Sequence, residues 1–133
     1  MFPLAHFSSP RVVAFFSDRA VDFRLSSEAA LRQAQQAHLE EIGEVRWVNI
    51  ISPRQVHGDV VKVIDDSSLL ERQDIVADGV VTNRPEIVLT IRTADCFPIF
   101  FYDDRREVIS LAHAGWRGAQ QRIAVKAMEA MIR

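Results

Sequence analysis

The stretch Val108-Ile109-Ser110-Leu111-Ala112-His113-Ala114-Gly115-Trp116-Arg117-Gly118 is the part of this chain that says most about its fold. Its first five residues form a short apolar run, which predicts a buried strand over residues 108–112. After the Gly118 turn, residues 119–132 contain no helix breaker and predict a terminal helix with Ile123, Met128 and Ile132 as its apolar positions. This order of strand, turn and helix places His113 directly after a strand.

Short apolar segments of the same kind continue toward the N-terminus, and each predicts a strand. They cover residues 12–16, 45–51, 60–64, 79–82, 87–91 and 99–102. A first helix is predicted between Ser27, which can cap its N-terminus, and Gly43, which can end it. The polar residues 65–73 indicate a surface loop. One helix, many strands and a final helix predict an α+β fold, a layered α/β sandwich on a mixed β-sheet.

The composition of the chain limits the classes of protein to which it can belong. The chain has 133 residues, of which 48% are hydrophobic and 26% charged, which predicts one globular domain. A formal net charge of -2 and scattered Lys and Arg argue against a nucleic-acid partner. No apolar run approaches the roughly 18 residues of a membrane span, so we expect no membrane partner. One cysteine excludes an intrachain disulfide, and the start lacks the pattern of a secretory leader, so a cytoplasmic location is expected.

Three potential metal ligands each lie at a predicted strand end. They are His57 in Gln55-Val56-His57-Gly58, Cys96 in Ala94-Asp95-Cys96-Phe97, and His113. Two imidazoles and a thiolate that converge would make a three-ligand metal site with an open fourth position, the arrangement of catalytic zinc. The wide separation of these residues in sequence is compatible with their convergence, but it matches no local metal-binding motif such as C-x-x-C. Read separately, Cys96 fits a small buried hydrophobe, His57 a turn residue and His113 a strand cap.

Two further residues are candidates for chemistry near these ligands. Arg117 lies at the start of the terminal helix, where an anion such as phosphate is favoured, although a solvated arginine fits equally. Asp95 is a candidate general acid or base, or a partner of a ligand imidazole, whereas an Asp in a turn often bonds its own backbone. Arg92 ends an apolar strand and is expected to face a carboxylate, a ligand or the mouth of a crevice.

Four motifs occur together in one order and give the chain a family resemblance. They are Gln55-Val56-His57-Gly58, Ala77-Asp78-Gly79-Val80-Val81-Thr82, Thr93-Ala94-Asp95-Cys96 with Pro98, and His113-Ala114-Gly115-Trp116-Arg117-Gly118. The chain therefore resembles the laccase-domain or polyphenol oxidase proteins, which include zinc-dependent purine nucleoside phosphorylases. The resemblance covers residues 54–133 and, more loosely, residues 12–16. It implies that His57, Cys96 and His113 are zinc ligands.

The resemblance also has consequences for extent and activity. Family members are usually longer, so residues 1–133 are expected to be a single laccase-domain-like domain lacking the family's C-terminal portion, and the family's Gly- and Ser-rich N-terminal stretch is replaced by residues 17–23. The implied activity is phosphorolysis of adenosine, inosine and methylthioadenosine, with some adenosine deamination. Purine nucleoside and phosphate would be the partners, Arg117 would hold phosphate, and Asp95 would transfer the proton.

Three alternatives to a phosphorylase stay open from the residues. A multicopper oxidase relay needs many imidazoles, and four histidines are too few for one, but a single copper on His57, Cys96 and His113 suits a laccase-like polyphenol oxidase. Cys96 could instead be a nucleophile activated by His113 in a hydrolase that edits a peptidoglycan precursor. A non-catalytic remnant that binds nucleoside or metal is the third alternative. The oligomeric state is not indicated.

Overall fold

The computed structural model describes residues 2–3, 12–17, 27–42, 49–65 and 74–133. The chain forms two compact units, Met1–Arg46 and Trp47–Arg133, and each is considered by itself. Among the described helices, none combines the length and apolar character that a membrane crossing requires.

The first unit contains the first helix and a small sheet. Helix α1 (Glu28–Ile42) begins after Ser27, whose Oγ accepts a hydrogen bond from the Ala30 N–H at 3.2 Å, so the predicted N-cap is confirmed. Strands β1 (Phe2–Pro3) and β2 (Phe15–Phe16) pair antiparallel. Strand β2 is shorter than the strand predicted over residues 12–16, and its two residues pair with the two residues of β1. The predicted stop at Gly43 lies outside the described residues.

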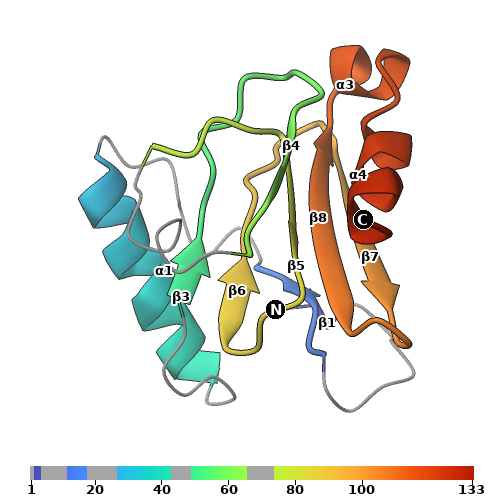
Figure 1. Cartoon of the computed structure of the whole chain (residues 1–133). Helices are drawn as coiled ribbons and strands as arrows, with labels where there is room; N and C mark the ends of the chain where they lie inside the picture. Colours follow the sequence, from blue (N-terminus) through green and yellow to red (C-terminus); the bar gives the residue numbers. More distant parts are fainter. Residues whose placement is uncertain (1, 4–11, 18–26, 43–48, 66–73) are drawn as a thin grey trace. The chain divides into compact units, whose positions relative to one another are not determined.

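The second unit contains a four-stranded mixed sheet and a separate parallel pair of strands (Figure 1). In the order in which they are hydrogen-bonded, the four strands are β4 (Val61–Val63), β5 (Gly79–Thr82), β8 (Val108–Ala114) and β7 (Phe97–Asp103). β4 and β5 run parallel, and the other two pairings are antiparallel. The separate pair is formed by β3 (Asn49–Ile51) and β6 (Ile87–Leu89). Helices with a mixed sheet confirm the predicted α+β fold.

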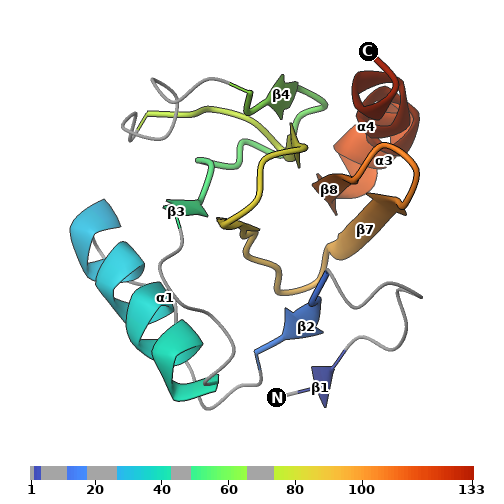
Figure 2. The ribbon, with the colours of Figure 1, turned by 60° about the horizontal axis from the view of Figure 1, so that its bottom comes forward.

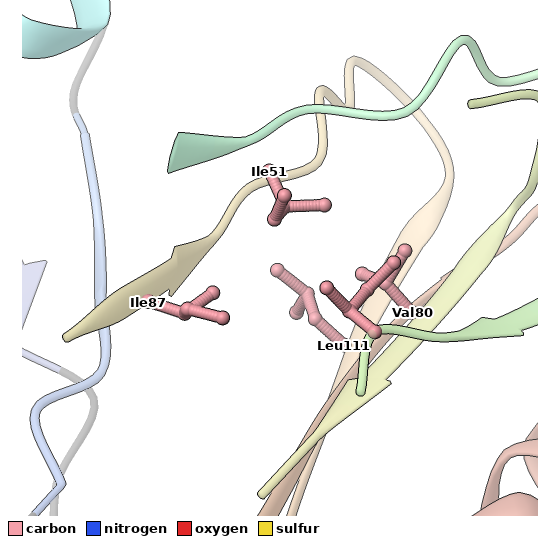
Figure 3. Packing of buried hydrophobic residues seen from close by; sticks show 5 residues of the cluster. Ile51, Val80, Ile87 and Leu111 are labelled. Atoms are coloured by element: carbon pink, nitrogen blue, oxygen red, sulfur yellow. The ribbon is translucent and has the colours of Figure 1, made fainter. Parts of the chain in front are cut away.

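Apolar side chains fill the space between the four-stranded sheet and the β3–β6 pair. Ile51 and Ile87 point toward Val80 and Leu111, as Figure 3 shows, and Ile64 belongs to the same buried cluster. The alternation of side chains along a strand sends every second residue of β8 to the opposite face. There Ala112 and Ala114 pack against the C-terminal helix, which lies on the side of β8 away from β3 in Figure 2. The four-stranded sheet is therefore covered on both faces.

The terminal helix differs from the prediction of one helix over residues 119–132. Helix α3 (Trp116–Gln120) begins earlier and α4 (Ile123–Met131) follows it. Between them Arg122 takes a left-handed conformation, with φ of 63°, and the N–H groups of Gln121 and Arg122 bond back to α3 carbonyls, which closes that helix. The turn changes the direction of the chain, and Ile123 at the start of α4 is fully buried.

The buried face of α4 also differs from the face that was predicted to be apolar. Its buried residues are Ile123, Ala127 and Met131, which follow one another at intervals of four. Met128 and Ile132, predicted as apolar contacts, are 47% and 62% exposed. The small Ala127 lets the helix approach Ala112 and Ala114, and this packing decides the face.

The segments that carry the candidate site residues meet at one end of the four-stranded sheet. β8 points toward α3, β7 starts at this end, and the chain between β3 and β4 runs to it as well (Figure 1). A carbon on Gly118 would come within 2.6 Å of the Gly58 carbonyl oxygen, so glycine is required where α3 meets that connecting chain. Lys126 of α4 forms an ion pair with Asp59 in the same connection. The loop that carries His57 is thus held against both helices.

Candidate metal centre

His57, Cys96 and His113 converge at this end of the sheet. His113 is the penultimate residue of β8, Cys96 directly precedes β7, and His57 lies in the connection between β3 and β4. Their ligand atoms all lie within 4.8 Å of one another. The two imidazole rings meet edge to face, with centroids 4.9 Å apart. His113 was expected after its strand but lies inside it, opposite Pro98, because β8 pairs with β7 over two more residues than the apolar run suggested.

The distances and the kinds of donor fit a single metal ion. Nitrogen and sulfur ligands on tetrahedral zinc lie about 3.3–3.6 Å apart, and the three donors here lie within 4.8 Å of one another. Within the described part of the chain, no fourth histidine, cysteine or carboxylate joins the group. His57 is exposed, Cys96 half-buried and His113 buried, so the centre opens to solvent on one side. Three ligands and one open position are typical of a catalytic metal site.

Asp78 is the residue at this site that had been assigned no role from the sequence. It is fully buried, and its Oδ1 accepts a hydrogen bond from His113 Nδ1 at 2.9 Å. Because Nδ1 is occupied in this way, Nε2 is the nitrogen that His113 offers to a metal. A carboxylate behind a ligand histidine fixes the orientation of the ring and raises its basicity. The signal in the sequence is a charged residue within the run Ala77-Asp78-Gly79-Val80-Val81, which is otherwise apolar.

The same carboxylate also holds the loop that carries His57. The backbone N–H groups of Val56, His57 and Gly58 donate to Asp78 at 3.1, 2.9 and 2.8 Å. His57 adopts φ of 59°, a left-handed conformation that costs energy in a residue with a side chain. Three hydrogen bonds from consecutive N–H groups to one carboxylate offset that cost. Asp78 therefore couples the positions of His57 and His113.

These contacts also control the charge of Asp78. Burial alone would raise the pKa of the carboxyl group, but hydrogen bonds from His113 and from the three N–H groups outweigh it and lower the pKa below the ordinary value of 3.8. Asp78 is consequently an anion in the folded protein at neutral pH. A negative charge beside His113 favours binding of a cation at the opposite ring nitrogen.

Gly115 leaves the space in which two of the ligands meet. A carbon at its Cβ position would lie 3.2 Å from Cys96 Sγ and 3.4 Å from His57 Cδ2. Its φ of -72° and ψ of 170° suit any residue. Gly115→Ala should therefore crowd the ligands without straining the backbone. We expect metal affinity to fall about 10-fold, while the free energy of unfolding of the metal-free protein stays within about 1 kcal/mol.

Titration with a metal-chelating competitor and denaturant unfolding would measure the two effects. Gly58→Ala is the matched control, since its added carbon would meet Asp78 Oδ2 and Val56 at 3.5 and 3.6 Å, which are ordinary contacts. Equal metal affinities of the two variants would show that the space at Gly115 is unrelated to the ligands.

The other residues singled out from the sequence lie around the centre. Asp95 is exposed in the bend that leads into Cys96. Arg117 is exposed on the five-residue helix α3, and its guanidinium carbon lies 5.1 Å from the centroid of the Trp116 ring. The Arg92 side chain is exposed too, while its backbone is engaged by the side chain of Gln55.

Two histidines and one cysteine that converge at the end of a mixed sheet make this an α+β protein with a candidate metal site. The chain belongs to the multi-copper polyphenol oxidoreductase laccase family, whose family model matches residues 18–133. The family predicted from the sequence motifs is thus confirmed.

Curated relatives carry enzyme names. A purine nucleoside phosphorylase of Mycobacterium tuberculosis is 39% identical over 88 residues, which cover 66% of this chain and 32% of the relative. An adenosine deaminase from an unknown prokaryotic organism is 37% identical over 91 residues, or 64% of this chain and 35% of the relative. The chain thus spans about a third of the length of these relatives.

Solved structures share the fold. A hypothetical protein of Bacillus licheniformis superposes with a TM-score of 0.69 at 27% identity, over 85% of this chain and 45% of that one. A protein of Neisseria meningitidis gives a TM-score of 0.63 at 25% identity, over 79% of this chain and 40% of that one. In both cases the likeness covers most of the present chain and less than half of the other.

Proposed function

We propose that this chain acts as a zinc-dependent purine nucleoside phosphorylase, with His57, Cys96 and His113 as the metal ligands. The observation that carries the proposal is the approach of three ligand atoms to within 4.8 Å of one another, although the residues are far apart in sequence. Asp78 holds the two histidines in place. Relatives named purine nucleoside phosphorylase support the substrate class, which is purine nucleoside and phosphate.

Zinc is the metal we propose, and copper is the alternative. Two histidines and a cysteine with an open position match catalytic zinc sites. The same set in a trigonal arrangement also binds copper, and the family description mentions copper.

Phosphorolysis breaks the bond between the purine nitrogen and the anomeric carbon of the ribose, forms a bond from that carbon to a phosphate oxygen, and leaves a proton on the purine. When bound, zinc would supply Lewis-acid stabilisation of negative charge on a substrate oxygen. We assign phosphate binding to Arg117, because a guanidinium pairs with two phosphate oxygens at once. We assign proton transfer to Asp95, which directly precedes the ligand Cys96.

The proposal is tested on the purified chain by metal analysis, thiol alkylation and phosphorolysis of inosine. We expect about one zinc per chain, a Cys96 thiol that resists alkylation until a chelator is added, and release of ribose 1-phosphate that depends on phosphate. Chelation should stop the reaction, and readdition of zinc should restore it.

The other readings give different results in the same experiment. Rapid alkylation of Cys96 in the untreated protein, together with no bound metal, would contradict the metal centre and favour a cysteine nucleophile. Bound zinc and a protected thiol without ribose 1-phosphate would contradict the phosphorylase and favour a binding remnant. Reconstitution by copper alone would favour a polyphenol oxidase.

Deamination is a second candidate activity, and one observation favours it. A relative of similar identity is named adenosine deaminase. Ammonia released from adenosine in the absence of phosphate would measure this activity in the same samples.

A further inference from the structure

The side chain of Gln55 pairs with the backbone of a residue 37 positions away. Its Nε2 donates to the Arg92 carbonyl oxygen at 2.8 Å, and the Arg92 N–H donates to its Oε1 at 2.8 Å. One side-chain amide therefore satisfies both backbone groups of one residue. In this respect it replaces the peptide group that a neighbouring strand would provide.

This pairing lies where backbone pairing of the parallel strands has ended. β3 and β6 are in register up to Ile51 and Leu89, and the Thr90 N–H still donates to the Ile51 carbonyl at 2.9 Å. Further along, the amide of Gln55 again joins the two chains. The chain after β3 and the chain after β6 thus run together toward the metal centre.

The position of each partner connects the pairing to the ligands. Gln55 lies two residues before His57, and Arg92 lies four residues before Cys96. Asp78 couples His57 to His113 but has no hydrogen bond to the segment that carries Cys96 among those found in the described residues. Beyond the pairing of β7 with β8, the placement of the Cys96 sulfur therefore does not depend on Asp78, whereas the placement of both histidines does.

We infer that Gln55 is a positioning residue that sets the place of the Cys96 thiolate relative to the two imidazoles. This inference rests on the proposed function, because it requires a metal that His57, Cys96 and His113 bind together. Gln55 is not one of the three potential ligands and acts through its hydrogen bonds to the Arg92 backbone. Loss of its two hydrogen bonds should loosen the sulfur ligand while the two histidines, held by Asp78, stay in place.

The test uses Gln55→Met, which keeps the length of the side chain and removes both hydrogen-bonding groups. Cobalt(II) is the probe, because a thiolate bound to cobalt gives a charge-transfer absorption in the near ultraviolet that histidine ligands do not give. We expect Gln55→Met to bind cobalt 10–100-fold more weakly and to show a weaker or shifted charge-transfer band per bound ion. A merely structural role would lower stability and leave that band unchanged.

Two further variants complete the experiment. Gln33→Met makes the same change at an exposed position of α1 and should leave affinity and absorption as in the wild type. Gln55→Glu keeps an acceptor for the Arg92 N–H but sets a carboxylate oxygen against the Arg92 carbonyl oxygen, so it should also bind cobalt more weakly than the wild type. It serves as the test if Gln55→Met does not fold.

The outcomes separate this inference from the proposed function. A wild-type protein without the thiolate band would overturn the metal centre itself, and the positioning role with it. A wild-type band that every folded Gln55 variant retains, at unchanged cobalt affinity, would overturn the positioning role and leave the metal centre standing.

Discussion

Replacing Cys96 with alanine should remove the bound metal and abolish phosphorolysis. In the proposed centre the sulfur is one of three ligands, and the remaining two imidazoles would hold a divalent ion much more weakly. Changes behind a ligand already cost 10–100-fold in affinity, so loss of the ligand itself should cost more than about 100-fold. Cys96 is half-buried and outside the apolar clusters, so the free energy of unfolding of the metal-free protein should change by less than about 1 kcal/mol.

Metal content after dialysis and ribose 1-phosphate release would be measured on the same samples of wild type and Cys96→Ala. Thr93→Ala is the control for metal content, because it removes a polar group from an exposed residue in the same segment. If Cys96→Ala lost activity but kept its metal, the thiol would be a nucleophile and the metal assignment would be wrong. If it kept both, Cys96 would have no part in the site.

The three residues of the candidate metal centre could be singled out from the sequence because each is next to a recognisable strand and turn. Strand β5 has the bounds that its apolar run predicted, and β8 begins at the predicted residue. Strand ends share one edge of a sheet, so side chains from distant segments can meet there. Convergence of His57, Cys96 and His113 followed from this rule together with the family motifs, and the spacing alone did not establish it.

Other features depend on tertiary contacts that no local pattern contains. The break between the helices at Arg122 could not be predicted, because no glycine or proline lies there. It arises because the residues directly after α3 form hydrogen bonds to that helix's own carbonyls before α4 packs on the sheet. The pairing of Gln55 with Arg92 joins residues 37 positions apart and requires the strand register to be known. Asp78 was visible as a charge in an apolar run, but its four hydrogen bonds come from two separate segments, residues 56–58 and His113.

Asp78→Asn should destabilise the protein and weaken the metal site together. An amide presents one oxygen and one NH₂ group, so the NH₂ would face either the Val56 and Gly58 N–H groups or the donors of His57 and His113. In either orientation the NH₂ group would face other buried hydrogen-bond donors, and neither of these facing groups would be an acceptor. Leaving a buried hydrogen-bonding group without its partner costs about 1–3 kcal/mol, and losing the carboxylate behind a ligand histidine should cost about 10–100-fold in metal affinity.

Denaturant unfolding and competitive metal titration would measure these two effects of Asp78→Asn. Asp104→Asn is the control, since this exposed residue accepts a hydrogen bond from the Tyr102 hydroxyl and an amide oxygen accepts it as well. Unchanged stability and affinity in Asp78→Asn would contradict the coupling of His57 to His113.

The pH dependence of stability gives Asp78 an independent signature. Its folded pKa lies below the ordinary value of 3.8, so folding favours the ionised form. The resulting stability is fully present above the unfolded pKa and is lost as the pH falls through the folded pKa. The difference in free energy of unfolding between wild type and Asp78→Asn should therefore be constant near neutral pH and shrink below pH 3.8. A difference that persists undiminished into strong acid would place the cost of Asp78→Asn in packing, because the charge of the carboxylate is then gone in both states.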